Sequence, residues 1–137
     1  MKKRNLFFGI GGIFGSLLDM FLTFVVIMFT LALKSCVGEN GDTTKLDIVA
    51  TIICLVLIFS CISAIITSIK GFSGIKIPLV YIIVQQLAHI VVAVVLIVSS
   101  FDNSDNFFLL LVSALCIIHI IIYITGQIKQ KTNLKIE

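Results

Sequence analysis

Four apolar stretches, each long enough to cross a lipid bilayer, constrain the fold of this chain more than any other feature. They run over residues 6–33, 48–69, 78–100 and 107–126. A helix needs about 20 residues to cross the hydrocarbon layer, because each residue adds about 1.5 Å. Membrane strands would alternate in polarity and close into a barrel, and the sequence does not alternate. The pattern predicts an all-α integral membrane protein, a four-helix bundle that forms a single domain over residues 1–137.

Little of the chain is left outside these stretches. Only 12% of the residues are charged, whereas soluble domains have about a quarter. The connections and tails are too short to bury a core of their own. The first stretch is about twice as long as the apolar part of a cleaved signal peptide and lacks a small-residue cleavage site, so we expect it to remain as a helix. Function is therefore expected within the helices, on their lipid-facing surface or in assembly.

The basic residues are divided unevenly between the two sides of the predicted membrane. Only Lys34 and Lys45 lie on one side. The other side carries Lys2, Lys3, Arg4, Lys70, Lys76, Lys129, Lys131 and Lys135. Because short cytoplasmic segments are enriched in Lys and Arg, both termini are predicted to be cytoplasmic. The net charge of +3 is then a topology signal, and no nucleic-acid partner is expected.

Each apolar stretch also carries a stripe of small or polar residues at helical spacing. In the first stretch Gly11, Gly15, Asp19 and Thr23 recur every four residues, and the stripe of the second includes Ala64. Helices in lipid associate through close approach at small residues and through polar contacts. We therefore expect Gly11, Gly15 and Ala64 to be helix-packing positions.

Asp19, His89 and His119 are the ionisable residues inside the apolar stretches that packing explains least well. A charged carboxylate at the centre of a membrane helix costs about 2.5–3.5 kcal/mol, so Asp19 needs a partner, a proton or water. Counted by helical rise from the cytoplasmic edge, Asp19 lies about 20 Å deep and His89 about 16 Å. Gln85 and His119 each lie about 10 Å deep. The spacing predicts one intramembrane polar cluster of Asp19, Gln85, His89 and His119.

Other residues are expected in ordinary structural positions. Tyr81 and Tyr123 are expected to anchor at the cytoplasmic interface, where amphipathic aromatic rings are common. Pro78 is expected to open the third helix, where its missing N–H has no cost. Gly71 and Gly74 are expected to form the tight turn that precedes it.

The four cysteines show no metal-binding spacing. Three lie inside the predicted helices, where Cys behaves as a small hydrophobe, and Cys36 is expected in an outer loop. No catalytic motif is present. We therefore expect no enzymatic activity, no cofactor and no metal site.

Three functions remain open. The leading hypothesis is a non-enzymatic multi-pass protein that acts through helix–helix and lipid contacts, as a membrane organiser or a subunit. The second is a small proton- or cation-coupled transporter or channel centred on Asp19, since intramembrane carboxylates and imidazoles build proton relays. Small multidrug-resistance transporters likewise have four helices and one acidic residue in the first, but their aromatic binding chamber is absent here. The third is a holin-like pore former, which fits the size and the basic tail.

The segment Ser68–Val91, SIKGFSGIKIPLVYIIVQQLAHIV, resembles the corresponding turn of small eukaryotic four-span proteins. These are the insect four-span membrane proteins and the lysosome-associated protein transmembrane family. The basic short turn, Pro78 and Gln85 carry the resemblance, which covers about a third of the chain. The Cys-rich start, outer Cys pair and Pro-Tyr sorting motif of those families are absent. Four-span proteins of AT-rich bacteria show a similar general pattern.

The resemblance implies membrane organisation or trafficking. It also implies a plasma or endolysosomal membrane for a eukaryotic protein, whereas a bacterial protein would lie in the cytoplasmic membrane. The expected partners are the lipid bilayer and either a second copy of the chain or other membrane subunits.

Overall fold

In the computed structural model, the described residues 4–37, 42–101 and 107–136 form four helices and no strand. The helices are α1 (Leu6–Val37), α2 (Thr44–Phe72), α3 (Leu79–Phe101) and α4 (Phe107–Ile136). Side chains are described only within residues 4–36, 42–95, 97 and 107–132. The predicted all-α architecture with four helices is confirmed.

The helices extend past the apolar stretches that predicted them. The helix α1 continues through Lys34 to Val37, so Cys36 belongs to α1, and its predicted place in a loop was wrong. The helix α4 continues through a polar segment to Ile136. Hydropathy detects only the apolar part of a helix. The helix itself is held by backbone hydrogen bonds, which continue into polar segments whose residues also favour the helical conformation.

Three of the helices are long and apolar enough to cross a membrane within the part of the chain that was searched. These segments are Leu6–Cys36, Thr44–Phe72 and Phe107–Thr132. The helix α3 contributes a shorter apolar segment, Leu79–Val95, because the side chains that follow lie mostly outside the described set.

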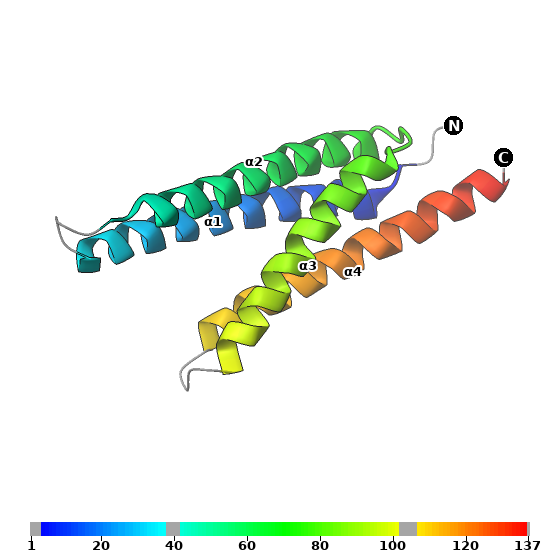
Figure 1. The fold of residues 1–137 in the computed structure, drawn as a ribbon. Helices are drawn as coiled ribbons and strands as arrows, with labels where there is room; N and C mark the ends of the chain where they lie inside the picture. Colours follow the sequence, from blue (N-terminus) through cyan, green and yellow to red (C-terminus); the bar gives the residue numbers. More distant parts are fainter. Residues whose placement is uncertain (1–3, 38–41, 102–106, 137) are drawn as a thin grey trace.

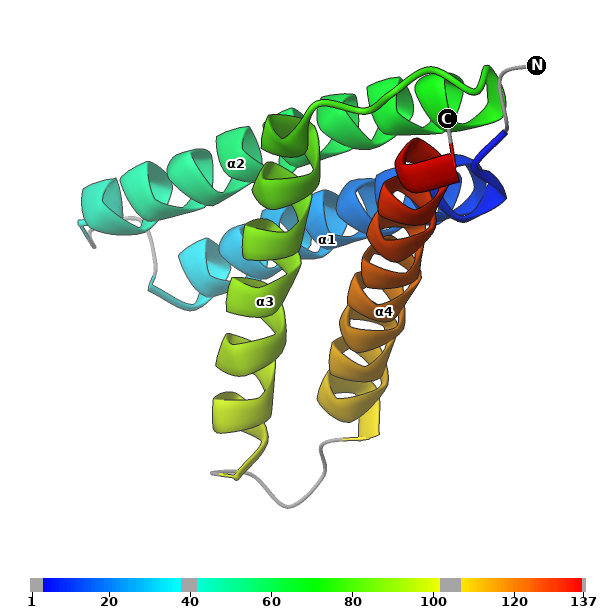
Figure 2. The ribbon, with the colours of Figure 1, turned by 90° about the vertical axis from the view of Figure 1, so that its right-hand side faces the viewer.

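The helices pair into two antiparallel hairpins. The helix α1 packs most extensively against α2, and α3 packs against α4. Figure 1 shows that both termini and the α2–α3 connection lie at one end, and that the two hairpins diverge away from that end. Figure 2 shows α3 and α4 crossing the α1–α2 hairpin at a steep angle. The arrangement therefore differs from a bundle whose four helices stay aligned along their whole length.

The core lies in the half of the molecule near the termini. Among the described side chains, none from Thr23 to Cys36 or from Thr44 to Val56 is buried. That half of the α1–α2 hairpin projects beyond α3 and α4 (Figure 1). An ion pair between Lys34 and Asp47 joins α1 and α2 there.

The turn between α2 and α3 is closed by backbone hydrogen bonds. The Ile75 N–H donates to the Lys70 carbonyl at 2.9 Å, and the Gly74 N–H donates to the Gly71 carbonyl at 3.3 Å. Gly74 has a φ of 66°, which glycine adopts without steric cost. Gly71 lies inside α2, so only Gly74 takes the predicted turn position. Pro78 immediately precedes α3, and its carbonyl accepts from the Tyr81 N–H.

Two apolar clusters flank a polar layer in the core. The cluster nearer the termini contains Phe8, Ile77, Ile82 and Tyr123. The other contains Leu18, Leu22, Leu57, Ala93, Val112 and Cys116. Gln85 and His89 on α3 and His119 on α4 fall between these two sets in sequence, whereas Asp19 on α1 lies between Leu18 and Leu22 of the second set. The fold thus brings polar side chains from several helices to one level.

Candidate functional site

Asp19 lies on α1 at the centre of the polar layer. It is 0% exposed, and neither of its carboxyl oxygens has a hydrogen bond of acceptable geometry within the described residues. Its backbone carbonyl accepts from the Thr23 hydroxyl at 2.8 Å. A buried carboxyl group with two unpartnered oxygens is unusual, since most buried polar atoms have a partner.

His89 on α3 is the nearest ionisable partner of Asp19. Its Nε2 lies 3.3 Å from Asp19 Oδ1, which is within ion-pair distance although the angle is too poor for a hydrogen bond. The other ring nitrogen, Nδ1, lies 2.9 Å from the Gln85 carbonyl oxygen. Both residues are essentially inaccessible to solvent. The contact joins α1 to α3.

The contact with Gln85 fixes the protonation of one nitrogen of His89. A carbonyl oxygen only accepts hydrogen bonds, so Nδ1 must carry a hydrogen. In the neutral ring Nε2 then has a lone pair that faces Asp19, and a protonated Asp19 would donate to it. In the charged ring Nε2 would donate to an ionised Asp19. Both of these arrangements would place one proton between the two side chains and leave the pair with no net charge.

Gln85 and His119 complete the predicted set. The Gln85 side chain donates from Nε2 to the Ser60 carbonyl on α2 at 3.1 Å. The His119 Nε2 on α4 lies 3.1 Å from the Gly11 carbonyl on α1, so it too must be the donor. The His119 Nδ1 is buried and has no partner among the described residues. The four predicted residues thus come from α1, α3 and α4. Gln85 bonds to α2, His89 bonds within α3, and His119 bonds to α1.

The two imidazole rings lie next to each other. The centroids of the His89 and His119 rings are 4.3 Å apart, and that of Tyr123 is 4.5 Å from His119. Aromatic groups extend from the Asp19–His89 pair through His119 to Tyr123. The rings of His89, His119 and Tyr123 therefore form one continuous set of contacts between α3 and α4.

Tyr123 is a site residue that the sequence interpretation missed. It is 0% exposed and packs edge to face against Phe8 at 5.5 Å, so the predicted place at the interface was wrong. Its hydroxyl oxygen is buried and has no hydrogen-bond partner among the described residues. The sequence did contain a signal for this position. Tyr123 follows His119 by four residues, so the two side chains lie on the same face of the helix.

The predicted packing glycines line the walls of the cluster. A Cβ at Gly11 would lie 2.8 Å from Ile122 Cγ2, and one at Gly15 would lie 2.5 Å from His119 Nε2. Gly12, on another face of α1, would bring a Cβ within 2.5 Å of the Ala64 carbonyl oxygen. Ala64 is fully buried. Only glycine leaves room for α4 on one face of α1 and for α2 on another.

The described residues contain no group of three or more His, Cys, Asp or Glu side chains arranged to hold a metal ion. Asp19, His89 and His119 are close together, but Nε2 of His119 is directed to the Gly11 carbonyl. The four cysteines are free, and Cys116 alone among them is buried. The arrangement that the structure shows is a buried contact between two ionisable side chains, Asp19 on α1 and His89 on α3.

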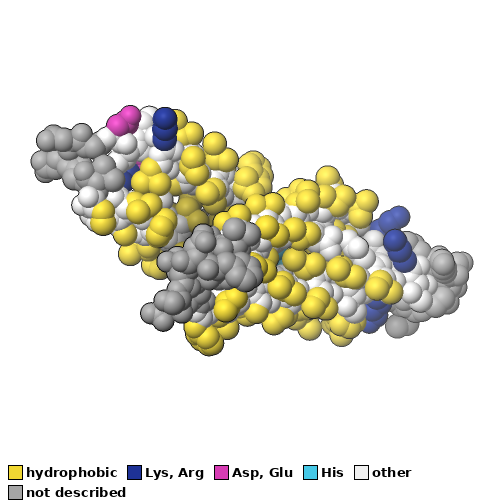
Figure 3. All heavy atoms as spheres, turned by 60° about the horizontal axis from the view of Figure 1, so that its bottom comes forward, with side chains coloured by type: hydrophobic (Ala, Val, Ile, Leu, Met, Phe, Trp, Pro, Cys, Tyr) yellow, Lys and Arg dark blue, Asp and Glu magenta, His cyan; other side chains and the backbone are white. Residues whose placement is uncertain are grey.

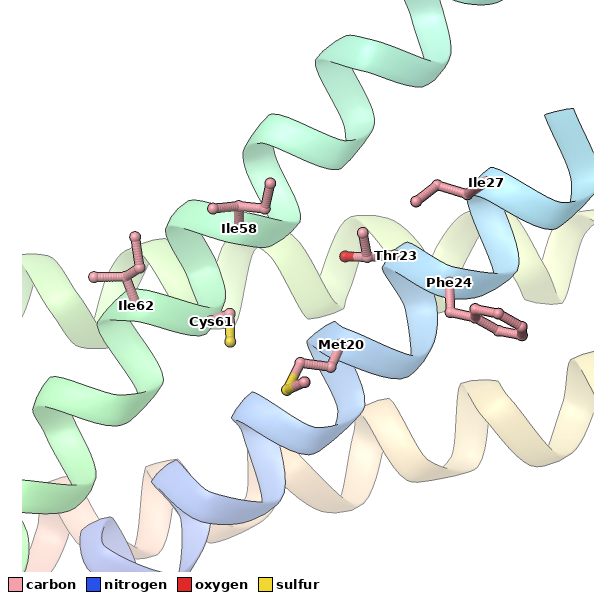
Figure 4. Close-up of a pocket in the computed structure, with 7 residues that line it drawn as sticks. All are labelled: Met20, Thr23, Phe24, Ile27, Ile58, Cys61 and Ile62. Carbon is pink, nitrogen blue, oxygen red and sulfur yellow. The ribbon is translucent and has the colours of Figure 1, made fainter. Parts of the chain in front are cut away.

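An apolar groove runs along the surface of the α1–α2 hairpin, separate from the cluster. It has a volume of about 340 Å³ and is lined by Met20, Thr23, Phe24, Ile27, Ile58, Cys61 and Ile62 (Figure 4). Cys61 bonds weakly to the Ser16 carbonyl at 3.7 Å. The lining carries no charged group, which suits contact with hydrocarbon.

Comparison of the chain with protein-family models, curated proteins and solved structures found no match.

Proposed function

We propose that this chain is a multi-pass integral membrane protein with four spans. The observation that carries the proposal is the large exposed apolar surface on all four helices. Within an apolar 18-residue window of each of the three long segments, only 17–28% is buried inside the protein. Figure 3 shows hydrophobic side chains over most of the visible face. Soluble proteins rarely expose a contiguous patch of this extent.

Charge supports an orientation with both termini in the cytoplasm. Arg4 precedes α1, Lys70 lies in the last turn of α2, and Lys76 lies in the α2–α3 connection. Lys129 and Lys131 lie toward the end of α4, and all these segments are at the end that carries the termini (Figure 1). The opposite end carries Lys34 and Lys45 together with Asp42 and Asp47. An excess of Lys and Arg marks the cytoplasmic side of a membrane protein. The predicted cytoplasmic residues Lys2, Lys3 and Lys135 have side chains outside the described set.

Within the membrane, the protein acts through helix–helix and lipid contacts and does not catalyse a reaction. Its buried polar groups favour this role, because Gln85 and His119 each bond to the backbone of another helix. Such bonds hold the register of neighbouring helices in lipid, where apolar burial gives little preference between partners. A second copy or another membrane subunit would dock on the exposed apolar faces.

Cysteine labelling of intact cells tests the topology. In a background with all four native cysteines replaced by Ser or Ala, reagent added outside should reach cysteines introduced at Asn40 and Asn103 but not at Thr132. Asn40 and Asn103 lie outside the described residues, and Thr132 follows the last apolar turn of α4. Labelling of Thr132 from outside would overturn the orientation. The mass of the detergent-solubilised protein would then decide whether it associates with itself.

A second candidate, a proton-coupled transporter, is favoured by one observation. His89 Nε2 lies 3.3 Å from Asp19 Oδ1, and neither carboxyl oxygen of Asp19 has a hydrogen bond within the described residues. Intramembrane acid–imidazole pairs of this kind occur in proton relays. Proton flux into vesicles that contain the protein separates the two candidates. A coupled site predicts flux that Asp19→Asn abolishes, whereas an organiser predicts no flux above empty vesicles.

A further inference from the structure

We propose that a pocket at the basic end of the molecule binds the headgroup of one anionic phospholipid. The proposal rests on membrane insertion as proposed above, and it assigns a specific lipid site to that protein. The pocket lies between the start of α3 and the end of α4 and has a volume of about 620 Å³. Lys76, Pro78 and Leu79 line it from one side, and Gln127, Gln130 and Lys131 from the other.

Two hydrogen bonds between Ile77 and Gln130 join the two sides of this pocket. The Ile77 N–H donates to Gln130 Oε1, and Gln130 Nε2 donates back to the Ile77 carbonyl, both at 3.3 Å. Ile77 is buried, with 1% of its surface exposed. Lys76 precedes Ile77 and Lys131 follows Gln130, so both lysines are attached to one rigid junction between α4 and the α2–α3 connection.

Among the described residues, no exposed acidic side chain balances the positive charge of this end. No Asp or Glu occurs between residues 48 and 101 or between residues 107 and 136. The single acidic residue of α1, Asp19, is buried in the polar layer. Lys70 lies over the Tyr81 ring and Lys129 over the Phe7 ring, each at 5.3 Å from the ring centroid. Of these four lysines, Lys76 and Lys131 are the two that line the pocket.

The apolar part of the pocket identifies the occupant as a lipid. Pro78, Leu79 and Ile82 form one wall, and Leu79 is 63% exposed toward the surrounding medium. This wall continues onto the exposed apolar face of α3 at Val80 and Ile83. A phosphate diester would meet the two ammonium groups while its acyl chains follow α3. Basic pockets between membrane helices on the cytoplasmic side recognise anionic headgroups in this way.

Native mass spectrometry of the full chain in detergent tests the site. The probes are short-chain phosphatidylglycerol and phosphatidylcholine at equal concentration. Since each lysine near an anionic surface contributes about 1 kcal/mol, wild type should bind phosphatidylglycerol roughly tenfold to thirtyfold more tightly. The double variant Lys76→Gln with Lys131→Gln should lose this preference. The double variant Lys76→Arg with Lys131→Arg should keep it.

The chain supplies a matched control at the same end. Lys70→Gln with Lys129→Gln removes the same charge but leaves the pocket intact, so it should retain the preference. Equal loss in the two Gln variants would overturn the site in favour of net charge. Thermal unfolding of each variant checks that it is folded, and a misfolded Gln variant is replaced by the single change Lys131→Gln.

Inorganic phosphate separates a lipid from a free anion. At equal concentration it should fail to displace phosphatidylglycerol, because it makes no contact with the apolar wall. Displacement by phosphate alone would assign the pocket to a soluble anion and overturn the lipid proposal. The measurement uses detergent-solubilised protein, so its result does not depend on the orientation that the cysteine labelling tests.

Discussion

Gly15 leaves the space that the His119 ring occupies: a Cβ at this position would lie 2.5 Å from His119 Nε2. That nitrogen donates to the Gly11 carbonyl one helical turn away. The bond between α4 and α1 therefore depends on the absence of a side chain at Gly15. A packing residue and a residue of the polar cluster act here as one unit.

Gly15→Ala should lower the free energy of unfolding by about 1–3 kcal/mol, the usual cost of overpacking a tight core. The added methyl group must displace His119 and break its bond to Gly11. Gly11→Ile and Gly15→Ile should be more severe and impair folding or assembly. Unfolding by SDS in mixed micelles measures the effect.

Phe21→Ile supplies the control for these glycine variants. Phe21 is 41% exposed and its ring lies 6.3 Å from that of Phe108, so the substitution should be tolerated. If Gly11→Ile, Gly15→Ile and Phe21→Ile are all equally stable, the glycine stripe faces lipid and the packing described here is incorrect.

Asn5 joins the start of α1 to the ends of both other long helices. Its side chain donates to the Gly126 carbonyl on α4 at 2.8 Å, and its backbone N–H donates to the Gly71 carbonyl on α2 at 3.0 Å. Asn5→Ala removes the side-chain bond and should cost about 1 kcal/mol. Asn5→Asp removes the donor but keeps the shape, so it should be at least as destabilising. Stability equal to wild type in both would contradict a role for this junction in holding the hairpins together.

The start of α2 should respond to acid. Asp42 is exposed, and hydrogen bonds from the Thr44 side chain and backbone N–H hold the pKa of its carboxyl group below the ordinary value of 3.8. A carboxyl group whose pKa is lowered in the folded state stabilises the fold above its unfolded pKa. That contribution is lost as the pH falls through the lower folded pKa. Protection of the Thr44 amide from hydrogen exchange, corrected for intrinsic rate, should decrease in that range below 3.8.

Asp42→Asn keeps a hydrogen-bond acceptor but cannot titrate. Its protection should therefore be independent of pH over the same range. A fall in protection that is equal in wild type and Asp42→Asn would show that another group controls the start of α2.

Periodicity and hydropathy were sufficient to predict the four helices, because lipid-spanning helices need long apolar stretches. They did not predict the divergence of the two hairpins. Crossing geometry depends on which small residues allow close approach, and Gly11, Gly12 and Gly15 direct different faces of α1 to α4 and α2. A stripe in one sequence does not show which helix will pack against it.

Part of the polar cluster could be predicted from the sequence, because the helical rise fixes the depth of each residue along its helix. Helical rise places Asp19 and His89 at similar depth, and the structure puts them in contact. The burial of Tyr123 could not be read from depth alone, since an interface tyrosine and a buried one occupy the same turn. What buries it is Phe8 from α1, a contact that depends on how α1 crosses α4.

The contact between Asp19 Oδ1 and His89 Nε2, at 3.3 Å, gives the remaining prediction. Asp19→Asn offers an amide N–H to His89 Nε2 and should keep nearly wild-type stability. Asp19→Leu removes both donor and acceptor beside a buried ring nitrogen and should cost about 1–3 kcal/mol. A double-mutant cycle of Asp19→Leu with His89→Leu should give a coupling of about 0.6–2 kcal/mol, the range for polar pairs in membranes. Nitrogen-15 spectra of the His89 ring should show Nδ1 protonated in wild type and in Asp19→Asn. An unprotonated Nδ1 would show that His89 does not donate to the Gln85 carbonyl, and additive effects of the two Leu substitutions would show that Asp19 and His89 are not coupled.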